Sequence, residues 1–181
     1  MPPVIRLAVP ADAKLLPAIE TSAAQAFRVI EDLAWLADSP PIPVERHRQL
    51  IALSTCWVAV DGENRPQGFL SAERYGRDLH IHELSVTREL QGQGTGRLLI
   101  EAAKDYARSS RLAFVTLTTF KNVPWNAPFY ARAGFQIKAS ADLDQRLAEP
   151  GPGFDAMVDL LIGLVQRLAV DVAELGRAAD R

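Results

Sequence analysis

The sequence predicts a mixed α/β domain, and two segments support this prediction. Residues 56–61 and 67–75 are predicted to be strands, and the polar turn between them makes them an antiparallel hairpin. Residues 79–119 then follow the order strand, helix, strand. Because such a crossover is right-handed, its two strands lie parallel in one sheet. We therefore expect a largely antiparallel sheet with a parallel pair at its centre, flanked by helices.

Length and composition are typical of one globular domain. The chain has 181 residues, of which 48% are hydrophobic and 23% charged, and its net charge is −2. A nucleic-acid-binding surface would normally show a basic excess, so no nucleic-acid partner is expected. The N-terminal residues lack the pattern of a signal peptide, which favours a cytoplasmic protein without a membrane partner. The single cysteine, Cys56, lies in an apolar strand and is expected to be a core residue.

The first part of the chain is predicted to form a strand and then helices. Residues 3–9 alternate weakly and suit the strand, and residues 12–28 carry apolar side chains at helical spacing. A shorter helical piece at 31–37 ends at the proline-rich turn 38–43, and a helix resumes at 44–54.

The strand at residues 79–86 contains a change of phase. Leu79 and Ile81 lie on one face, but the next apolar residues are Leu84 and Val86, so the apolar pattern shifts by one residue. A bulge near residues 82 and 83 would restore the core face. Bulged strands diverge from their neighbours and leave backbone groups unpaired.

A glycine-rich loop joins this strand to a helix predicted at 95–109. The loop consists of Gln91, Gly92, Gln93, Gly94, Thr95, Gly96 and Arg97. Because the glycines carry no side chains, backbone N–H groups can converge on an anion at the start of the helix, where the helix dipole also favours negative charge. A phosphate is the expected ligand, with Arg97 as an additional positive charge.

The spacing of the loop decides which phosphate ligand it suits. A dinucleotide fingerprint requires glycine where Arg97 stands, and a nucleoside-triphosphate loop requires Lys and then Ser or Thr after Gly96. Both patterns fail. The remaining pattern, Gln91-x-x-Gly94-x-Gly96, resembles the acetyl-CoA loop of the GNAT superfamily of N-acyltransferases.

A second motif strengthens the resemblance. The chain reads Asn126-x-x-Phe-Tyr130 followed by Gly134-Phe135, which resembles a superfamily segment with asparagine, Phe-Tyr and Gly-Phe in that order. Asn126 suits the N-cap of a helix of about two turns, and Gly134 suits its C-terminal end. The resemblance spans residues 3–138, and two motifs in the right order are more specific than either alone.

The resemblance implies a binding mode for acetyl-CoA as cosubstrate, without a metal. The backbone of Leu84, Ser85 and Val86 would bind the pantetheine arm, Asn126 would lie near it, and the glycine loop would bind the phosphates. The early helical region would form one wall of the acceptor site. Phe27, Trp35 and the turn 38–43 would then either touch substrate or serve as ordinary core and connection.

Acetyl transfer to an amine needs a base and a proton for the departing thiolate. Glu83 on the expected bulge is the best candidate for the base, because partial burial raises the pKa of a carboxyl group. His80 and His82 are rivals, as is water. Tyr130 is expected to protonate the thiolate, whereas a nucleophilic role for Ser85 is disfavoured because direct transfer needs no covalent intermediate.

The end of the chain departs from the superfamily pattern. Residues 155–177 carry apolar side chains at helical intervals and are predicted to form a long C-terminal helix, with a short closing strand at 154–160 as the alternative. The chain is therefore predicted to consist of a domain at residues 1–150 and a helical extension at residues 151–181. Because one sheet face cannot cover all its apolar side chains, we expect a homodimer through residues 155–176, with a helix packed within its own subunit as the alternative.

The leading prediction is therefore a GNAT-type N-acetyltransferase that acts on a primary amine of a small molecule. A protein N-terminus or a lysine side chain is the alternative acceptor. A different class, a catalytically weak CoA-binding module, would not need Glu83 and Tyr130 together beside the thioester.

Overall fold

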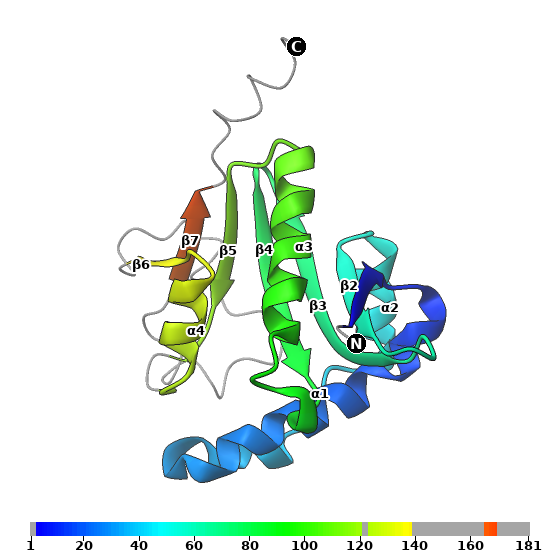
Figure 1. Ribbon diagram of the computed structural model, residues 1–181, viewed down its shortest axis with the longest axis vertical. Coiled ribbons are helices and arrows are strands. Elements are labelled where there is room, and N and C mark those ends of the chain that lie inside the picture. Colours follow the sequence, from blue (N-terminus) through cyan, green and yellow to red (C-terminus); the bar gives the residue numbers. More distant parts are fainter. Residues whose placement is uncertain (1–2, 121–122, 139–164, 170–181) are drawn as a thin grey trace.

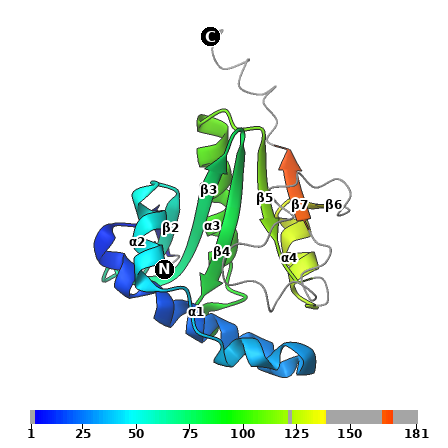
Figure 2. The same ribbon diagram turned by 180° about the vertical axis from the view of Figure 1, so that it is seen from behind.

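The computed structural model describes residues 3–120, 123–138 and 165–169, and its strands form one mixed sheet with helices on both faces (Figures 1 and 2). The strand order is β1-β2-β3-β4-β5-β7-β6. The strands are β1 (Val4–Leu7), β2 (Cys56–Val60), β3 (Pro66–Tyr75), β4 (Asp78–Val86), β5 (Phe114–Thr118), β6 (Gln136–Lys138) and β7 (Val165–Ala169).

The pairing of the strands confirms the predicted mixture. Strands β1 to β4 pair antiparallel with one another, and β4 pairs parallel with β5. The connection between β4 and β5 runs through α3 (Thr95–Ser109), which crosses one face of the sheet (Figure 1). The antiparallel hairpin and the parallel crossover are thus both present, as the sequence predicts.

The predicted bulge in β4 is also confirmed. Ser71 pairs with Glu83 and Ala72 pairs with Ile81, so His82 is an additional residue on β4. Pairing between β4 and β5 ends at Ile81, although β4 continues to Val86, and the two strands diverge beyond this point (Figure 2). The second half of β4 therefore has a paired edge toward β3 and an open edge toward β5.

Helical elements differ from the prediction mainly near the N-terminus. The expected continuous helix at 12–28 is wrong, because the chain forms a 3₁₀ turn, an α-helix and another 3₁₀ turn there. Pro17 lies in the first turn of the α-helix and donates no backbone hydrogen bond, which interrupts the helical ladder before it. The elements are η1 (Pro10–Lys14), α1 (Leu16–Ala24), η2 (Gln25–Val29), η3 (Glu31–Asp38), α2 (Val44–Ala52), η4 (Arg88–Leu90) and α4 (Asn126–Arg132).

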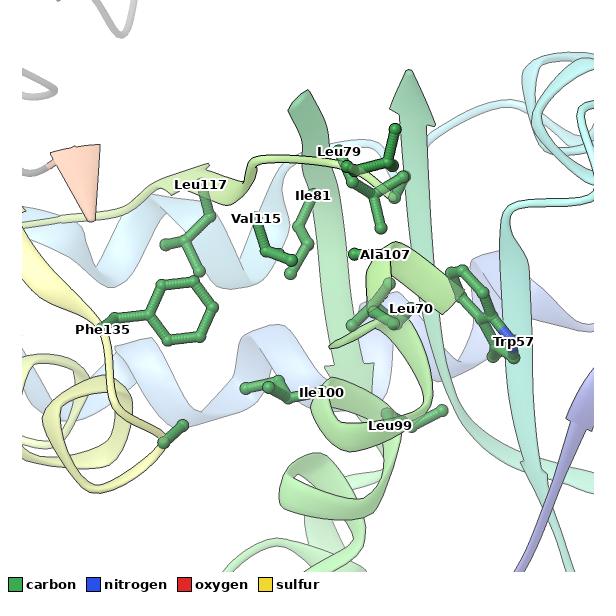
Figure 3. Packing of buried hydrophobic residues seen from close by; sticks show 14 of the residues in the cluster. Trp57, Leu70, Leu79, Ile81, Leu99, Ile100, Ala107, Val115, Leu117 and Phe135 are labelled. Carbon is green, nitrogen blue, oxygen red and sulfur yellow. The ribbon is translucent and has the colours of Figure 1, made fainter. Parts of the chain in front are cut away.

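Two apolar cores hold the layers together. The larger core lies between the sheet and α3, where Leu99 and Ile100 pack against strand residues such as Leu70 and Ile81 (Figure 3). The smaller core joins the opposite face to α1 and α2 through residues that include Leu16, Val58, Cys56 and Phe69. Cys56 is 1% exposed, and burial raises the pKa of its thiol to about 12, as expected for a core cysteine.

The predicted C-terminal helix is wrong over residues 165–169. This segment is strand β7, which pairs antiparallel with β5 on one side and with β6 on the other. Without it, the outer edge of β5 would present unpaired backbone groups. The alternative strand at 154–160 and the rest of the predicted helix lie outside the described residues.

Within the described residues, none of the helices combines the length and the apolar character that crossing a membrane requires.

Candidate active site

The open edge of β4 is the centre of the candidate site. Leu84, Ser85 and Val86 follow the bulge, on the part of β4 that β5 no longer covers. Backbone groups of an uncovered strand can accept an extended ligand as if it were another strand. The structure thus leaves this part of β4 unpaired with β5 where the resemblance implies that the pantetheine arm binds.

The glycine loop begins α3 with backbone groups alone. Gly94 is the N-cap residue at φ 91°, Gly92 has φ 76°, and no side chain caps the helix. Among the described residues, no atom lies within 4 Å of a Cβ added to Gly94, so the loop faces away from them there. Since the first amides of a helix have no intrahelical acceptor, this end suits the phosphates of CoA.

Gly96 has a packing role instead. A Cβ at Gly96 would lie 3.2 Å from Cζ of Phe129, so its absence allows α3 and α4 to approach closely. Thr95 is buried beside it, whereas the Arg97 side chain is exposed and makes no hydrogen bond or ion pair with a described residue. The guanidinium of Arg97 is therefore available to an anion.

The side chain of Gln91 holds the loop in place through three hydrogen bonds. Its Nε2 donates to the carbonyl of Val86 at 3.1 Å and to that of Ala23 at 3.3 Å, while Arg88 donates to its Oε1 at 3.1 Å. Gln93 Nε2 likewise donates to the carbonyl of Glu89 in η4 at 2.9 Å. Both glutamines hold the loop in shape, and the carbonyl of Val86 is already bonded by Gln91.

Glu83 lies at the bulge, partly buried, as the sequence predicts for a base. Burial raises the pKa of its carboxyl group, while Ser85 Oγ, which donates to Glu83 Oε1 at 2.6 Å, and the Leu84 backbone oppose that increase. The side chain of Ser85 is therefore committed to Glu83. A carboxyl group with a raised pKa is better matched to accepting an amine proton near neutral pH.

Tyr130 approaches the same place from α4. Its ring packs against Phe129 and Phe135, with centroids 5.0 Å and 5.8 Å away. Burial and, second, the negative charge of Glu83 raise the pKa of its phenol. The hydroxyl makes no hydrogen bond to a described residue, so its proton can be donated to a ligand.

The position of Asn126 differs from the expectation. The N-cap of α4 is Trp125, and Asn126 is the first helical residue, where its Nδ2 donates to Thr119 Oγ1 at 2.8 Å. Its side chain is thus used to link α4 to the end of β5. The expected end of α4 is confirmed, because Gly134 has φ 84° and directly follows the C-cap residue Ala133.

The rival histidines have other partners. His80 Nδ1 lies 3.0 Å from Thr116 Oγ1, and burial lowers the pKa of His80 to about 4. His82 is the residue at the bulge, and its Nε2 lies 3.2 Å from Glu73 Oε2. Among the three candidates, Glu83 has the pKa shift that favours a base at neutral pH.

The sequence interpretation missed Glu20. This residue of α1 follows Leu16 by four positions, so a charged residue on the inward stripe was the available signal. Its side chain is 20% exposed, and burial and the charge of Glu83 raise its pKa to about 8. The tertiary structure thus brings two carboxyl groups to the site.

The expected acceptor wall is partly assembled. Phe27 contacts the rings of Phe120 and Trp125, with centroids 5.9 Å and 6.1 Å away, so η2 meets the segment before α4. Trp35 is 41% exposed and donates to the backbone of its own 3₁₀ helix. From the turn 38–43, the N–H of Ile42 donates to Glu20 Oε2 at 3.0 Å.

Comparisons with known proteins agree with this geometry. Residues 52–137 match the family model described as an acetyltransferase (GNAT) domain. The structure is similar to the PaiA N-acetyltransferase from Thermoplasma acidophilum in complex with coenzyme A, with a TM-score of 0.70, 14% identity, and coverage of 93% of this chain and 99% of that chain.

Two other solved structures show the same arrangement. For Rv2747 from Mycobacterium tuberculosis, in complex with CoA and NLQ, the TM-score is 0.67 at 16% identity, and 92% of this chain and 99% of that chain are covered. For a phosphinothricin acetyltransferase from Sinorhizobium meliloti, in complex with AcCoA, the TM-score is 0.60 at 17% identity. The match covers 76% of this chain and 77% of that chain. At such identities the likeness concerns the fold.

Proposed function

We propose that this chain, whose residues 52–137 match the model of an acetyltransferase (GNAT) domain, is an acetyl-CoA-dependent acetyltransferase. In this proposal it acetylates a primary amine of a small molecule by direct attack in a ternary complex. The observation that carries this proposal is the convergence of three features. The open edge of β4, the uncapped start of α3 and the pair Glu83 and Tyr130 meet at one place.

Acetyl-CoA binds through backbone groups in this proposal. The amides after Gly94 and the exposed Arg97 bind the pyrophosphate, and the open edge of β4 binds the pantetheine arm. Since the carbonyl of Val86 is bonded by Gln91 and the N–H of Leu84 by Glu83, the N–H of Val86 and the carbonyl of Leu84 supply the remaining main-chain contacts. The thioester then lies between Glu83 and Tyr130.

The chemistry requires that a C–N bond form while the C–S bond of the thioester breaks. Glu83 takes a proton from the acceptor ammonium, and the neutral nitrogen attacks the thioester carbonyl. The tetrahedral intermediate expels the thiolate, which receives a proton from the hydroxyl of Tyr130. The second proton of the attacking nitrogen leaves as the amide forms and restores the hydroxyl of Tyr130. The products are the acetamide and CoA, and the proton on Glu83 is the one net proton released to solvent.

The two residues assist each other during this sequence. The negative charge of Glu83 raises the pKa of Tyr130 in the resting site. When Glu83 accepts the amine proton, that charge disappears and the phenol becomes a stronger acid. Tyr130 thus becomes a better donor at the step that needs its proton.

The test is thiol release from acetyl-CoA with a panel of small primary amines, with mass spectrometry of the acetylated products. We expect at least one amine to be acetylated, and Tyr130→Phe to reduce the rate while CoA binding persists. Peptides that offer an N-terminal amine or a lysine belong in the same panel. Tight CoA binding without acetylation of any amine or peptide would identify a CoA-binding module instead.

A further inference from the structure

Glu20 of α1 is held over β4 by contacts on both sides of it. The N–H of Ile42 donates to Glu20 Oε2 at 3.0 Å. Two residues further along α1, Ser22 Oγ accepts from the N–H of Arg88 at 3.0 Å. The next residue, Ala23, accepts at its carbonyl from Gln91 at 3.3 Å. These contacts fix α1 against the end of β4, on the sheet face where the smaller core joins α1 to Phe69, the register partner of Ser85. Glu83 lies two residues before Ser85 and therefore on the same face.

The two carboxyl groups share this place without a cation. Among the described residues, no lysine or arginine forms a hydrogen bond or ion pair with Glu20 or Glu83. The titratable groups around the pair are His47 from α2 and Tyr130 from α4. Each carboxyl group is therefore next to a second potential negative charge that the described residues do not balance.

His47 does not supply the missing positive charge. Its Nε2 lies 3.9 Å from Glu20 Oε2, but the side chain is 0% exposed and neither ring nitrogen has a hydrogen-bond partner among the described residues. Burial lowers the pKa of His47 to about 4, so the ring is neutral near pH 7. Burial and the charge of Glu83 raise the pKa of Glu20 to about 8, so Glu20 keeps a proton near pH 7 until a cation takes its place.

We propose that Glu20 and Glu83 together bind the acceptor as its ammonium ion, and that the acceptors are amines without a carboxylate on the carbon that bears the reacting nitrogen. This inference rests on the proposed function and names its substrate class. Glu20 binds and orients the ammonium, and Glu83 removes its proton before attack. A carboxylate on the neighbouring carbon would meet two acidic groups and be repelled.

Binding of the acceptor is then an exchange of positive charges. The ammonium displaces the proton that the two carboxyl groups hold, and that proton goes to solvent. The rest of the acceptor can extend toward the aromatic contact of Phe27 with Phe120 and Trp125, where α1 continues into η2. Uncharged alkyl or aryl groups suit that surface.

The first experiment tests the carboxylate pair without any acetyl transfer. Protein labelled with ¹³C at the glutamate carboxyl groups is titrated by NMR, and the signals of Glu20 and Glu83 are assigned from their loss in Glu20→Gln and Glu83→Gln. We expect both to titrate well above ordinary glutamates, and the midpoint of Glu83 to fall in Glu20→Gln. An unchanged Glu83 midpoint would overturn the pairing. Glu45→Gln on the exposed side of α2 is the matched control.

The second experiment tests the acceptor class with matched compounds. Isoamylamine is compared with leucine, and 2-phenylethylamine with phenylalanine, because each pair differs only by a carboxylate beside the nitrogen. We expect kcat/KM for the amine to exceed that for the amino acid by about 100-fold or more, the scale of like-charge repulsion. Equal values, or a preference for the amino acid, would overturn the inference.

The variant Glu20→Gln separates binding from chemistry. It keeps an oxygen that can accept from Ile42, so the fold is retained and can be checked by its melting temperature. We expect KM for the amine to rise about 10-fold, the scale of a hydrogen bond to a charged group, with a smaller change in kcat and none in KM for acetyl-CoA. An unchanged KM for the amine would overturn the role of Glu20.

Failure of the proposed function has a different result. If wild-type protein binds CoA but acetylates neither these compounds nor the wider panel, the acetyltransferase proposal fails and the substrate class fails with it. The NMR titration still decides whether Glu20 and Glu83 form a pair. Acetylation of other amines with an unchanged Glu83 midpoint would contradict the pairing alone.

Discussion

Tyr130 combines a free hydroxyl with an environment that keeps it protonated. Burial and the charge of Glu83 both raise the pKa of its phenol, so it retains its proton at neutral pH until the thiolate forms. We predict that Tyr130→Phe lowers kcat by about 10² to 10⁴ while affinity for acetyl-CoA changes little. Steady-state kinetics and calorimetric titration with acetyl-CoA measure the two quantities. Full activity of the variant would exclude Tyr130 as the acid.

The raised pKa of Glu83 determines the pH dependence that we expect for the reaction. Because burial raises the pKa of its carboxyl group, the ionised form that accepts a proton is lost at a higher pH than for an ordinary glutamate. We expect kcat/KM to fall as pH decreases through this raised pKa, and Glu83→Gln to remove that acidic limb. The limb is measured from initial rates between about pH 5 and 10, a range around the pKa values of buried carboxyl groups. Persistence of the limb would transfer the base role to a histidine or to water.

Among the elements, the loop before α3 combines an unusual backbone conformation with open space. Gly94 has φ 91° and an unobstructed Cβ direction, so a side chain there strains the backbone and occupies the proposed pyrophosphate position. We predict that Gly94→Val abolishes retention on a CoA resin. Gly76→Val, at φ 60° in the distant β3–β4 turn, is the control for strain alone. Equal retention by both variants and wild type would contradict the loop assignment.

The ion pair between β1 and η1 predicts a loss of stability at low pH. Burial raises the pKa of Asp12, but hydrogen bonds from Arg6 at 2.7 Å and from the N–H of Val9 at 2.8 Å outweigh it, and the net pKa is below the ordinary value. The stabilisation is therefore fully present above the ordinary aspartate pKa and is lost as pH falls through the lower folded value.

Replacement of Asp12 gives the corresponding measurement. We expect Asp12→Asn to lower the free energy of unfolding at pH 7 by about 1–3 kcal/mol, since charge-assisted bonds at a buried side chain are lost. Asp105→Asn, in an exposed pair on α3, is the control and should change it by less than about 1 kcal/mol. Urea titrations that show equal effects for both variants would contradict the prediction.

At the scale of the whole molecule, the oligomeric state stays a prediction. The homodimer was expected from a long apolar C-terminal helix, but residues 165–169 belong to the sheet and do not form part of a helix. Apolar residues remain frequent on both sides of β7, including Met157, Leu161 and Val172, and extended apolar surface is usually buried. We therefore still propose a homodimer through this region.

Light scattering on the purified protein at micromolar concentration measures the oligomeric state directly. We expect a dimer, and Leu161→Glu should dissociate it while leaving CoA binding intact. Leu53→Glu, at an exposed position after α2, is the control. A monomeric wild type would refute the dimer, and a dimer that survives Leu161→Glu would place its interface elsewhere.

Local patterns by themselves determined much of this protein. The phase shift between Ile81 and Leu84 located the bulge in β4, because alternation in a strand has a fixed period of two. The helix at 95–109 and the glycine loop before it were predicted with their observed bounds, since start signals and helical periodicity lie within a few residues of each other. Glu83 and Tyr130 followed from those elements and from the family resemblance.

Only the tertiary structure decided two other features. Glu20 and Glu83 lie 63 positions apart, and their approach depends on how α1 packs on the sheet, which no local pattern encodes. Residues 165–169 have a helical pattern but form a strand, because the edge of β5 offers backbone hydrogen bonds that outweigh a weak local propensity. In both cases the deciding interaction joins segments that are distant in the sequence, and its free energy exceeds the local preference.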